Sequence, residues 1–217
     1  MNQPVDPSVR RFLKTLATGA AALAAGCATR QVEVPEEGFE YRTVEPPQPT
    51  ATPGKLELIE FFWYACPFCN ALEPIMREWL RRQPPDVAFR RVHVARPPLQ
   101  QLHYTLEVLG KADELSERIY AAIHVQQLDL DTRDRMADFV ARNGVDRARF
   151  VETFGSPAVR EKMQEATATV NAYKVDGVPT FAVNGKWITA PSMLGGSYTA
   201  TLRVLDYLLA RERRGAA

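Results

Sequence analysis

The stretch that most constrains the fold runs from Leu56 to Glu73, with the sequence LELIEFFWYACPFCNALE. A run of mostly apolar residues leads directly into Cys66-Pro67-Phe68-Cys69, and a polar pattern with helical spacing follows. Proline suits the first turn of a helix, because its missing N–H leaves no hydrogen bond unmade there and its φ is already helical. The stretch therefore predicts a buried strand, a tight turn and a helix, with Cys66 at the helix N-terminus.

Cys66 and Cys69 are predicted to form a redox-active pair. Unpaired N–H groups and the positive end of the helix dipole favour a thiolate at Cys66, which lowers the cysteine pKa from its usual value of about 8.5. Cys69 lies three residues further on the same helix face, so its sulfur can reach that of Cys66. The pair can close into a disulfide or open to a dithiol.

The main alternative for a CxxC motif is half of a structural zinc site, or a plain disulfide staple. Structural zinc takes four ligands, usually from two such pairs or from one pair with spaced histidines. The chain has one other cysteine, Cys27, and its three histidines show no metal-ligand spacing; they are His93, His103 and His124. The sequence therefore favours redox chemistry, and it predicts no metal and no cofactor.

Residues 1–26 are predicted to be an export signal that lies outside the fold. Arg10, Arg11 and Lys14 form a basic region, and a short apolar segment rich in small residues follows over 16–26. That segment is too short to span a bilayer as a permanent helix. The sequence RRFLK resembles the twin-arginine pattern, but its Phe and Leu come one place too early, so Sec export remains an alternative.

Cys27 ends the run LAAGC, which is similar to a bacterial lipobox. In a lipobox the cysteine receives a diacylglyceryl anchor and becomes the mature N-terminus, but here Ala24 stands where a larger aliphatic residue is usual. Ordinary cleavage nearby, with an incidental cysteine, is the alternative. In both cases the sequence predicts a protein that works outside the cytoplasm, where disulfides can persist.

The order of the remaining elements predicts an α/β fold. Residues 27–54 are interpreted as a proline-rich tether with an edge strand over 39–44. A strand over 87–94 is predicted to pair in parallel with 58–63, and the cysteine helix, expected to end near Arg82, crosses between them. This arrangement places the helix on one face of a sheet.

A long helical region and a final sheet segment complete the chain. Helical spacing continues for about 75 residues from Leu99, and its apolar stripes predict the core of a helical subdomain. Val178-Pro179 then leads into a hairpin with Asn184-Gly185 at its turn and a returning strand over 186–188. A cis Val178–Pro179 bond is predicted, with a trans proline that merely starts the strand as the alternative. An amphipathic helix over 197–214 closes the chain.

In combination these motifs resemble the bacterial DsbA family of periplasmic thiol:disulfide oxidoreductases. The resemblance extends from about Phe39 to Tyr207 and rests on Glu60-Phe61-Phe62, Cys66-Pro67-Phe68-Cys69, Val92-His93-Val94, Gly177-Val178-Pro179 and Val183-Asn184-Gly185-Lys186. It implies a thioredoxin fold with an inserted α-helical domain. The corresponding division is 55–97 for the first part of the thioredoxin fold, 98–165 for the insert and 166–217 for the second part.

The resemblance also implies a role for each matching residue. Cys66 corresponds to an exposed nucleophile and Cys69 to its buried partner, while Val178 and Pro179 present backbone to a substrate peptide. Glu60 corresponds to a buried acid that manages the proton of Cys69.

Three further positions are expected to tune the redox pair. Arg91 occupies the place of a lysine that often pairs with the buried acid, and a solvent-facing Glu60 is the alternative to such a pair. Between the cysteines the family often has Pro-His, whereas this chain has Pro67 and Phe68. Pro67, Phe68 and Arg91 are therefore the candidate tuning residues.

The function implied is the introduction of disulfides into reduced exported polypeptides in the periplasm, with reoxidation by a DsbB-like membrane quinone reductase. The protein would be soluble or anchored to the inner membrane through Cys27. Its net charge of +1 does not indicate a surface that binds nucleic acid. An isomerase of the DsbC type would need a dimerisation domain, for which residues 28–54 are too short. A thioredoxin-type reductase would lack the large helical insert, and a non-enzymatic binding or chaperone module would leave Cys66 without a role.

Overall fold

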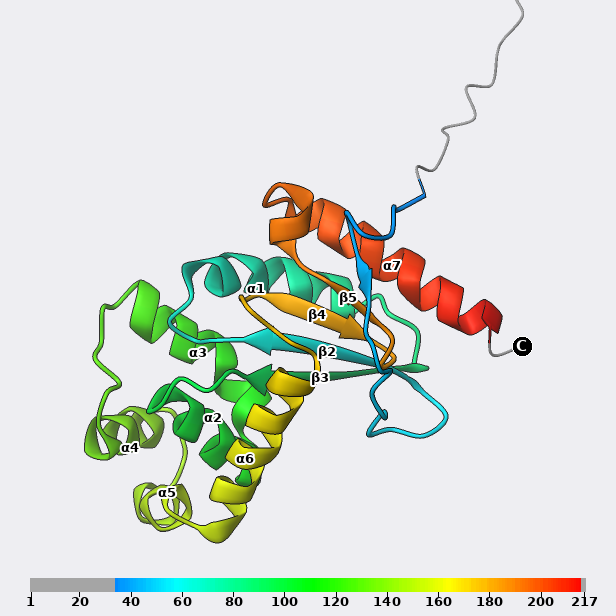
Figure 1. Cartoon of the computed structure of the whole chain (residues 1–217). Coiled ribbons are helices and arrows are strands. Elements are labelled where there is room, and N and C mark those ends of the chain that lie inside the picture. Colours follow the sequence, from blue (N-terminus) through cyan, green and yellow to red (C-terminus); the bar gives the residue numbers. More distant parts are fainter. Residues whose placement is uncertain (1–33, 216–217) are drawn as a thin grey trace, which may run out of the picture. The chain divides into compact units, whose positions relative to one another are not determined.

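The structure is a computed structural model that describes residues 34–215 (Figure 1). The predicted export signal over 1–26 and the lipidation candidate Cys27 lie outside the described residues. Within 34–215, none of the helices combines the length and the apolar character that crossing a membrane would need.

A five-stranded sheet forms the centre of the described part of the chain, with the strand order β1-β5-β4-β2-β3. Strand β2 runs parallel to β3 and antiparallel to β4, and β5 pairs antiparallel with both β4 and β1. The bounds are β1 Arg42–Thr43, β2 Leu56–Phe62, β3 Val87–His93, β4 Thr180–Val183 and β5 Trp187–Thr189. The predicted parallel pairing on either side of the cysteine helix is confirmed.

Helices cover both faces of this sheet (Figure 1). Helices α1 and α7 share a core with one face, and α6 packs against the other face and against α2. The bounds are α1 Pro67–Leu80, α2 Leu99–Val108, α3 Ala112–His124, α4 Arg133–Arg142, α5 Arg147–Phe154, α6 Pro157–Ala172 and α7 Tyr198–Gly215, with a short 3₁₀ helix at Pro191–Leu194. The long helical region after β3 is therefore present, divided into five helices.

Strand β2, which leads into the cysteine motif, lies at the centre of the sheet, and every one of its residues is buried. Successive side chains of a strand point to opposite faces. Leu58 joins the core under α1 and α7, whereas Ile59 and Phe61 join the core under α6. Each such apolar side chain contributes roughly 1.5–3 kcal/mol when it is fully buried. Glu60 lies on the same face as Leu58, toward α1.

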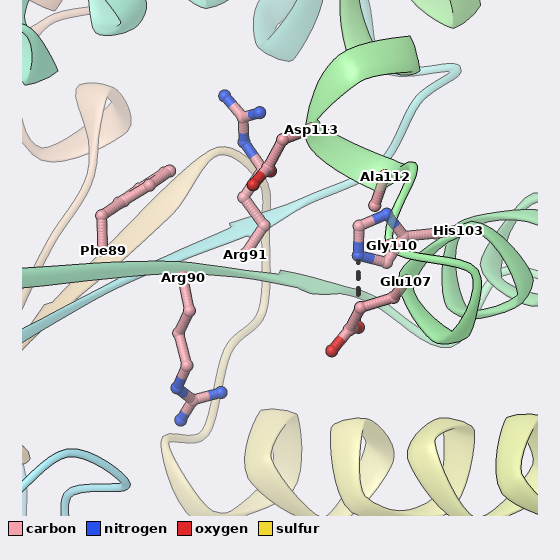
Figure 2. Close-up of a pocket in the computed structure, with 8 residues that line it drawn as sticks. All are labelled: Phe89, Arg90, Arg91, His103, Glu107, Gly110, Ala112 and Asp113. Carbon is pink, nitrogen blue, oxygen red and sulfur yellow. Dashed lines mark ion pairs between the residues drawn. The ribbon is translucent and has the colours of Figure 1, made fainter.

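The register of β2 and β3 places two ion pairs on opposite faces of the sheet. Arg91 is the direct neighbour of Glu60 and pairs with it on the face of α1. Arg90 extends to the other side and reaches Glu57, with Nε 3.2 Å from Oε1. Figure 2 shows the two arginine side chains leaving β3 in opposite directions.

Some predicted boundaries need correction. The edge strand expected over 39–44 contains only Arg42–Thr43, because the preceding residues form a turn in which the Gly38 N–H donates to the Tyr41 carbonyl at 2.7 Å. Gly38, which precedes the expected strand, takes a φ of +91°, a value that favours glycine and lets this turn form. The cysteine helix ends at Leu80, two residues before the expected end. The proposed division between residues 165 and 166 falls inside α6, which continues without interruption.

Candidate active site

Cys66 caps the N-terminus of α1, as the sequence predicted. It has extended backbone angles (φ −78°, ψ 120°), and Pro67 follows in the first turn. Its Sγ lies 3.5 Å from the carbonyl oxygen of Val178, to which the thiol donates. Cys66 is only 5% exposed, which corrects the expectation of an exposed nucleophile, and the Val178 carbonyl is one of the groups that contact it.

The surroundings of Cys66 favour its thiolate. The pKa of Cys66 is lowered to about 6, first by a hydrogen bond from the Cys69 thiol, and burial opposes this shift. Backbone N–H groups of Cys69 and Phe68, at the open end of the helix, lower the pKa further, and so does the charge of His124. Most of the Cys66 side chains are therefore ionised at pH 7, which lies above this pKa.

Cys69 has the opposite character. It is completely buried, and its pKa is raised far above the ordinary value by its hydrogen bond to Cys66, by burial and by the charges of Cys66 and Glu60. Cys69 therefore holds its proton while Cys66 releases one. Neighbouring thiols that differ in this way divide the chemistry into an attacked sulfur and a leaving sulfur.

This asymmetry predicts the alkylation behaviour of the reduced chain. The rate of Cys66 modification by iodoacetamide should follow its thiolate fraction, with a midpoint near pH 6. Cys69 should stay unmodified until the protein unfolds. Peptide mapping of modification against time at pH 5, 6, 7 and 8 measures both sites, and equal rates at the two cysteines would contradict the asymmetry.

The peptide bond between Val178 and Pro179 is cis, which confirms the prediction from the sequence. Pro179 is buried just ahead of β4, and Val178 is half-buried beside Cys66. Two residues after Cys66, the Phe68 side chain is 65% exposed, and the Phe68 carbonyl accepts a hydrogen bond from the Tyr198 hydroxyl at 3.2 Å. The motif thus leaves a large apolar side chain in solvent next to the reactive sulfur.

Beneath the cysteines, Arg91 joins two buried carboxylates. Its Nε lies 2.9 Å from Oε2 of Glu60, and its Nη2 lies 2.6 Å from Oε2 of Glu73. Glu60 is 1% exposed and Glu73 is 4% exposed, which excludes the solvent-facing alternative for Glu60. The Arg91 side chain is 10% exposed, so the network is largely removed from water.

The network leaves Glu60 with a high proton affinity. Burial raises the pKa of Glu60, Arg91 counteracts this effect, and the charge of Glu73 adds to it. The pKa of Arg91 lies above its usual range: burial lowers it, but the carboxylates of Glu60 and Glu73 outweigh that effect. Arg91 therefore keeps its charge, while Glu60 is a carboxyl that can take up or release a proton close to Cys69.

Sequence reasoning missed several residues that reach the site. Glu73 carried one usable signal, because it lies four residues after Cys69 and hence on the same helix face. Ser116, Tyr120 and His124 come from α3 and had no such signal. Ser116 contacts Arg91, and Tyr120 packs against the ring of Tyr64. His124 contacts the carbonyl oxygen of Tyr64.

A pocket of about 280 Å³ opens beside the network (Figure 2). Arg90 and Arg91 contribute to it from β3, and His103 and Glu107 contribute from α2, where their side chains approach to 3.9 Å. The other lining residues are Phe89, Gly110, Ala112 and Asp113. This pocket contains neither cysteine. It is a recess next to the stem of Arg91.

A sheet of this topology, with a CxxC pair at a helix N-terminus opposite a cis-proline, defines a class of thiol:disulfide redox proteins. The family model described as the DSBA-like thioredoxin domain matches residues 95–203. The thiol:disulfide interchange protein DsbA of Bordetella parapertussis is 38% identical over 207 residues, which are 94% of this chain and 98% of that relative. The chain therefore belongs to the DsbA family and is a thiol:disulfide oxidoreductase.

Solved structures agree with this assignment. The crystal structure of Pseudomonas aeruginosa DsbA has a TM-score of 0.79 at 38% identity, covering 84% of this chain and 96% of its own. DsbA from Xylella fastidiosa has a TM-score of 0.78 at 32% identity, covering 83% and 99%. The predicted thioredoxin fold with an inserted α-helical region is thereby confirmed. The cysteine motif precedes the range of the family model, but an alignment over 94% of the chain includes it.

Proposed function

We propose that this chain oxidises reduced exported polypeptides in the periplasm by passing its Cys66–Cys69 disulfide to them. The observation that carries the proposal is the opposite ionisation of the two sulfurs, with the pKa of Cys66 lowered to about 6 and that of Cys69 raised. A stabilised thiolate favours the reduced form of the pair, so the disulfide form is a strong oxidant.

The steps follow from this asymmetry. A substrate thiolate attacks Sγ of Cys66, the bond to Cys69 breaks, and Cys69 leaves as a thiolate that takes up a proton. A second substrate thiolate then attacks the substrate sulfur of the mixed disulfide, and Cys66 leaves as a thiolate. The substrate gains a disulfide, and the chain is left with a thiolate and a thiol.

The other candidate residues would serve this exchange. Glu60 would supply the proton that Cys69 takes up, with Arg91 holding the carboxyl in place and limiting its pKa. The support is the 2.9 Å contact between them and the burial of Glu60. Val178 and Pro179 would bind the extended backbone of a substrate, since the Val178 carbonyl lies beside Cys66.

The equilibrium of the pair with a glutathione buffer tests the proposed function. The reduced form should predominate even in a buffer dominated by glutathione disulfide. Because Cys66 ionises near pH 6 and glutathione does not, the equilibrium constant for reduction should be about tenfold higher at pH 7 than at pH 5. A pair that stays oxidised under reducing conditions would place the chain among reductants and defeat the proposal.

Phe68 and Pro67 would tune the potential of the pair. Phenylalanine cannot donate a hydrogen bond or place a positive charge near the Cys66 thiolate, whereas a histidine can. We expect Phe68→His to lower the pKa of Cys66 further and to raise the reduction potential by about 30 mV for each pKa unit, the equivalent of about 1.4 kcal/mol. Phe68→Leu is the control for lost aromatic surface. Unchanged values in the histidine variant would leave Phe68 with a role in substrate contact alone.

Two finer points of the proposal concern the setting of the reaction. Reoxidation is assigned to a DsbB-like membrane quinone reductase, which would attack the reduced pair through the same face as a substrate. Cys27 is the candidate for a lipid anchor. Mass spectrometry of the mature chain tests the anchor: a diacylated cysteine at the N-terminus supports it, and a free N-terminus beyond residue 27 removes it.

A further inference from the structure

Helix α3 presents three polar side chains on the face that meets the redox pair. Ser116, Tyr120 and His124 are spaced four residues apart, so they lie one above another along the helix. Nη1 of Arg91 lies 3.4 Å from the Ser116 hydroxyl. One turn beyond Tyr120, Nε2 of His124 lies 2.8 Å from the Tyr64 carbonyl oxygen. These contacts at both ends of the row direct Tyr120 between the Arg91 network and the turn that holds Cys66.

Among the residues that the structure describes, two buried polar atoms near Arg91 have no hydrogen-bond partner. They are the hydroxyl of Tyr120 and Oε1 of Glu60, in residues that are 2% and 1% exposed. The other oxygen of Glu60 is already engaged by Arg91 Nε at 2.9 Å. Buried polar atoms are nearly always paired in proteins, so an unpaired donor whose proton affinity responds to the charge of a carboxyl with an unpaired oxygen points to a functional reason.

The Tyr120 hydroxyl can act only as a protonated group. Its pKa is raised well above the ordinary value, first by burial and then by the charges of Glu60, Cys69 and Glu73. Its ring meets that of Tyr64 edge to face, with centroids 5.2 Å apart. The titratable and charged groups around it are Glu60 on β2, Cys69 and Glu73 on α1, Arg91 on β3, Tyr64 after β2, and His124 on α3.

We propose that Tyr120 is a positioning residue of the redox reaction, which donates a hydrogen bond to Oε1 of Glu60 whenever that carboxyl is ionised. The bond is direct or is carried by one water molecule. This inference rests on the proposed role of Glu60 as the group that gives and takes the proton of Cys69. Helix α3, which lies in the inserted region, thereby sets the proton affinity of a carboxyl on the central sheet.

The effect of Tyr120 on the proton affinity of Glu60 can be followed in one step, the attack of Cys69 on a mixed disulfide of Cys66. In the mixed disulfide of Cys66 with glutathione, the Cys69 thiol transfers its proton to the carboxylate of Glu60 and attacks Sγ of Cys66. The protein disulfide forms, the bond to glutathione breaks, and glutathione leaves as a thiolate. A donor on Oε1 favours the ionised carboxyl. With Tyr120 in place, Glu60 can therefore accept this proton at a lower pH.

The test is the pH profile of that resolving step in Tyr120→Phe, followed by stopped flow with excess glutathione disulfide. Loss of the donor should move the midpoint of the profile upward by about one pH unit, a tenfold change in proton affinity. Titration of the Glu60 carboxyl by ¹³C NMR should show the same upward shift. The pH midpoint of Cys66 alkylation should remain near 6, because it reports a different group.

Tyr173→Phe is the matched control. Tyr173 is 3% exposed, its hydroxyl also has no partner, and it packs on Phe61 on the face of α6, away from the cysteines. This variant should leave the midpoint unchanged. In a Glu60→Gln background, Tyr120→Phe should cause no further change.

An unchanged midpoint in Tyr120→Phe would overturn the proposal. An equal shift in Tyr173→Phe, or a Tyr120→Phe effect that persists without the Glu60 carboxyl, would do the same. The exchange with glutathione is measured on the chain itself. A potential too low for an oxidase would therefore refute the proposed function without altering the result for Tyr120.

Discussion

Cys69→Ser should abolish turnover and trap the chain as a mixed disulfide through Cys66. The variant keeps the groups of the helix N-terminus that stabilise the Cys66 thiolate, but it lacks the thiol that releases a bound partner. Incubation with glutathione disulfide should therefore convert nearly all of the protein to a stable adduct, visible by intact mass. Oxidation of a reduced test peptide should fall to the uncatalysed background.

Cys66→Ser is the paired variant with the opposite expectation. It too should lose all oxidase activity, but it should form almost no adduct, because Cys69 is fully buried and holds its proton. At pH 5, where the Cys66 thiol is mostly protonated, both variants should unfold at denaturant concentrations similar to that of the reduced parent protein. Comparable adduct formation in the two variants would show that Cys69 is reactive, in conflict with its burial.

Among single substitutions of Arg91, Glu60 and Glu73, Arg91→Met should lower the free energy of unfolding the most. It leaves Glu60 and Glu73 buried without their shared cation, and breaking a buried ion pair from one side typically costs about 3–5 kcal/mol. Urea unfolding of the reduced chain measures the loss. Arg90→Met is the matched control on the same strand: Arg90 is 37% exposed and its partner Glu57 also accepts the Ala51 N–H, so the loss should be smaller.

The destabilisation by Arg91→Met should depend on pH. The pKa of Glu60 is already raised, and without Arg91 it should rise further. A carboxyl with a raised pKa in the folded state stabilises the fold below its unfolded pKa, and this contribution is lost as pH rises through the folded value. The variant should therefore regain part of its stability in mild acid. Adding Glu60→Gln should restore part of the stability at neutral pH, and a deficit that is unaffected by pH and by Glu60→Gln would show that lost packing is the cause.

Features that depend on neighbouring residues in the chain could be predicted from the sequence. The apolar run of β2, the proline after Cys66 and the CxxC spacing lie within one stretch, and together they indicated the strand, the turn and the helix cap. The hairpin at Asn184-Gly185 is local in the same sense, since both residues take the positive φ that such a turn requires.

The rest of the site depends on contacts between distant segments. Tyr120 lies more than fifty residues after Cys66, and its spacing within α3 is that of an ordinary core position. Its nearness to the cysteines results from the packing of α3 against α1, which no local pattern encodes. The edge strand is shorter than expected for a different reason, because a turn that begins at Gly38 takes up the first residues of the alternating pattern over 39–44.

The two ion pairs between β2 and β3 also constrain how these strands come together during folding. Sliding one strand by a single residue would send each of its side chains to the opposite face of the sheet. Arg91 would then leave Glu60 and point toward the apolar core under α6, so a slip in either direction would place a guanidinium in that layer. A slip in one of the two directions would also put Val92 beside Glu60 and leave this carboxylate without a cation. The buried ion pair between Arg91 and Glu60 thus penalises misaligned pairing of two parallel strands, which apolar side chains alone would discriminate less strongly.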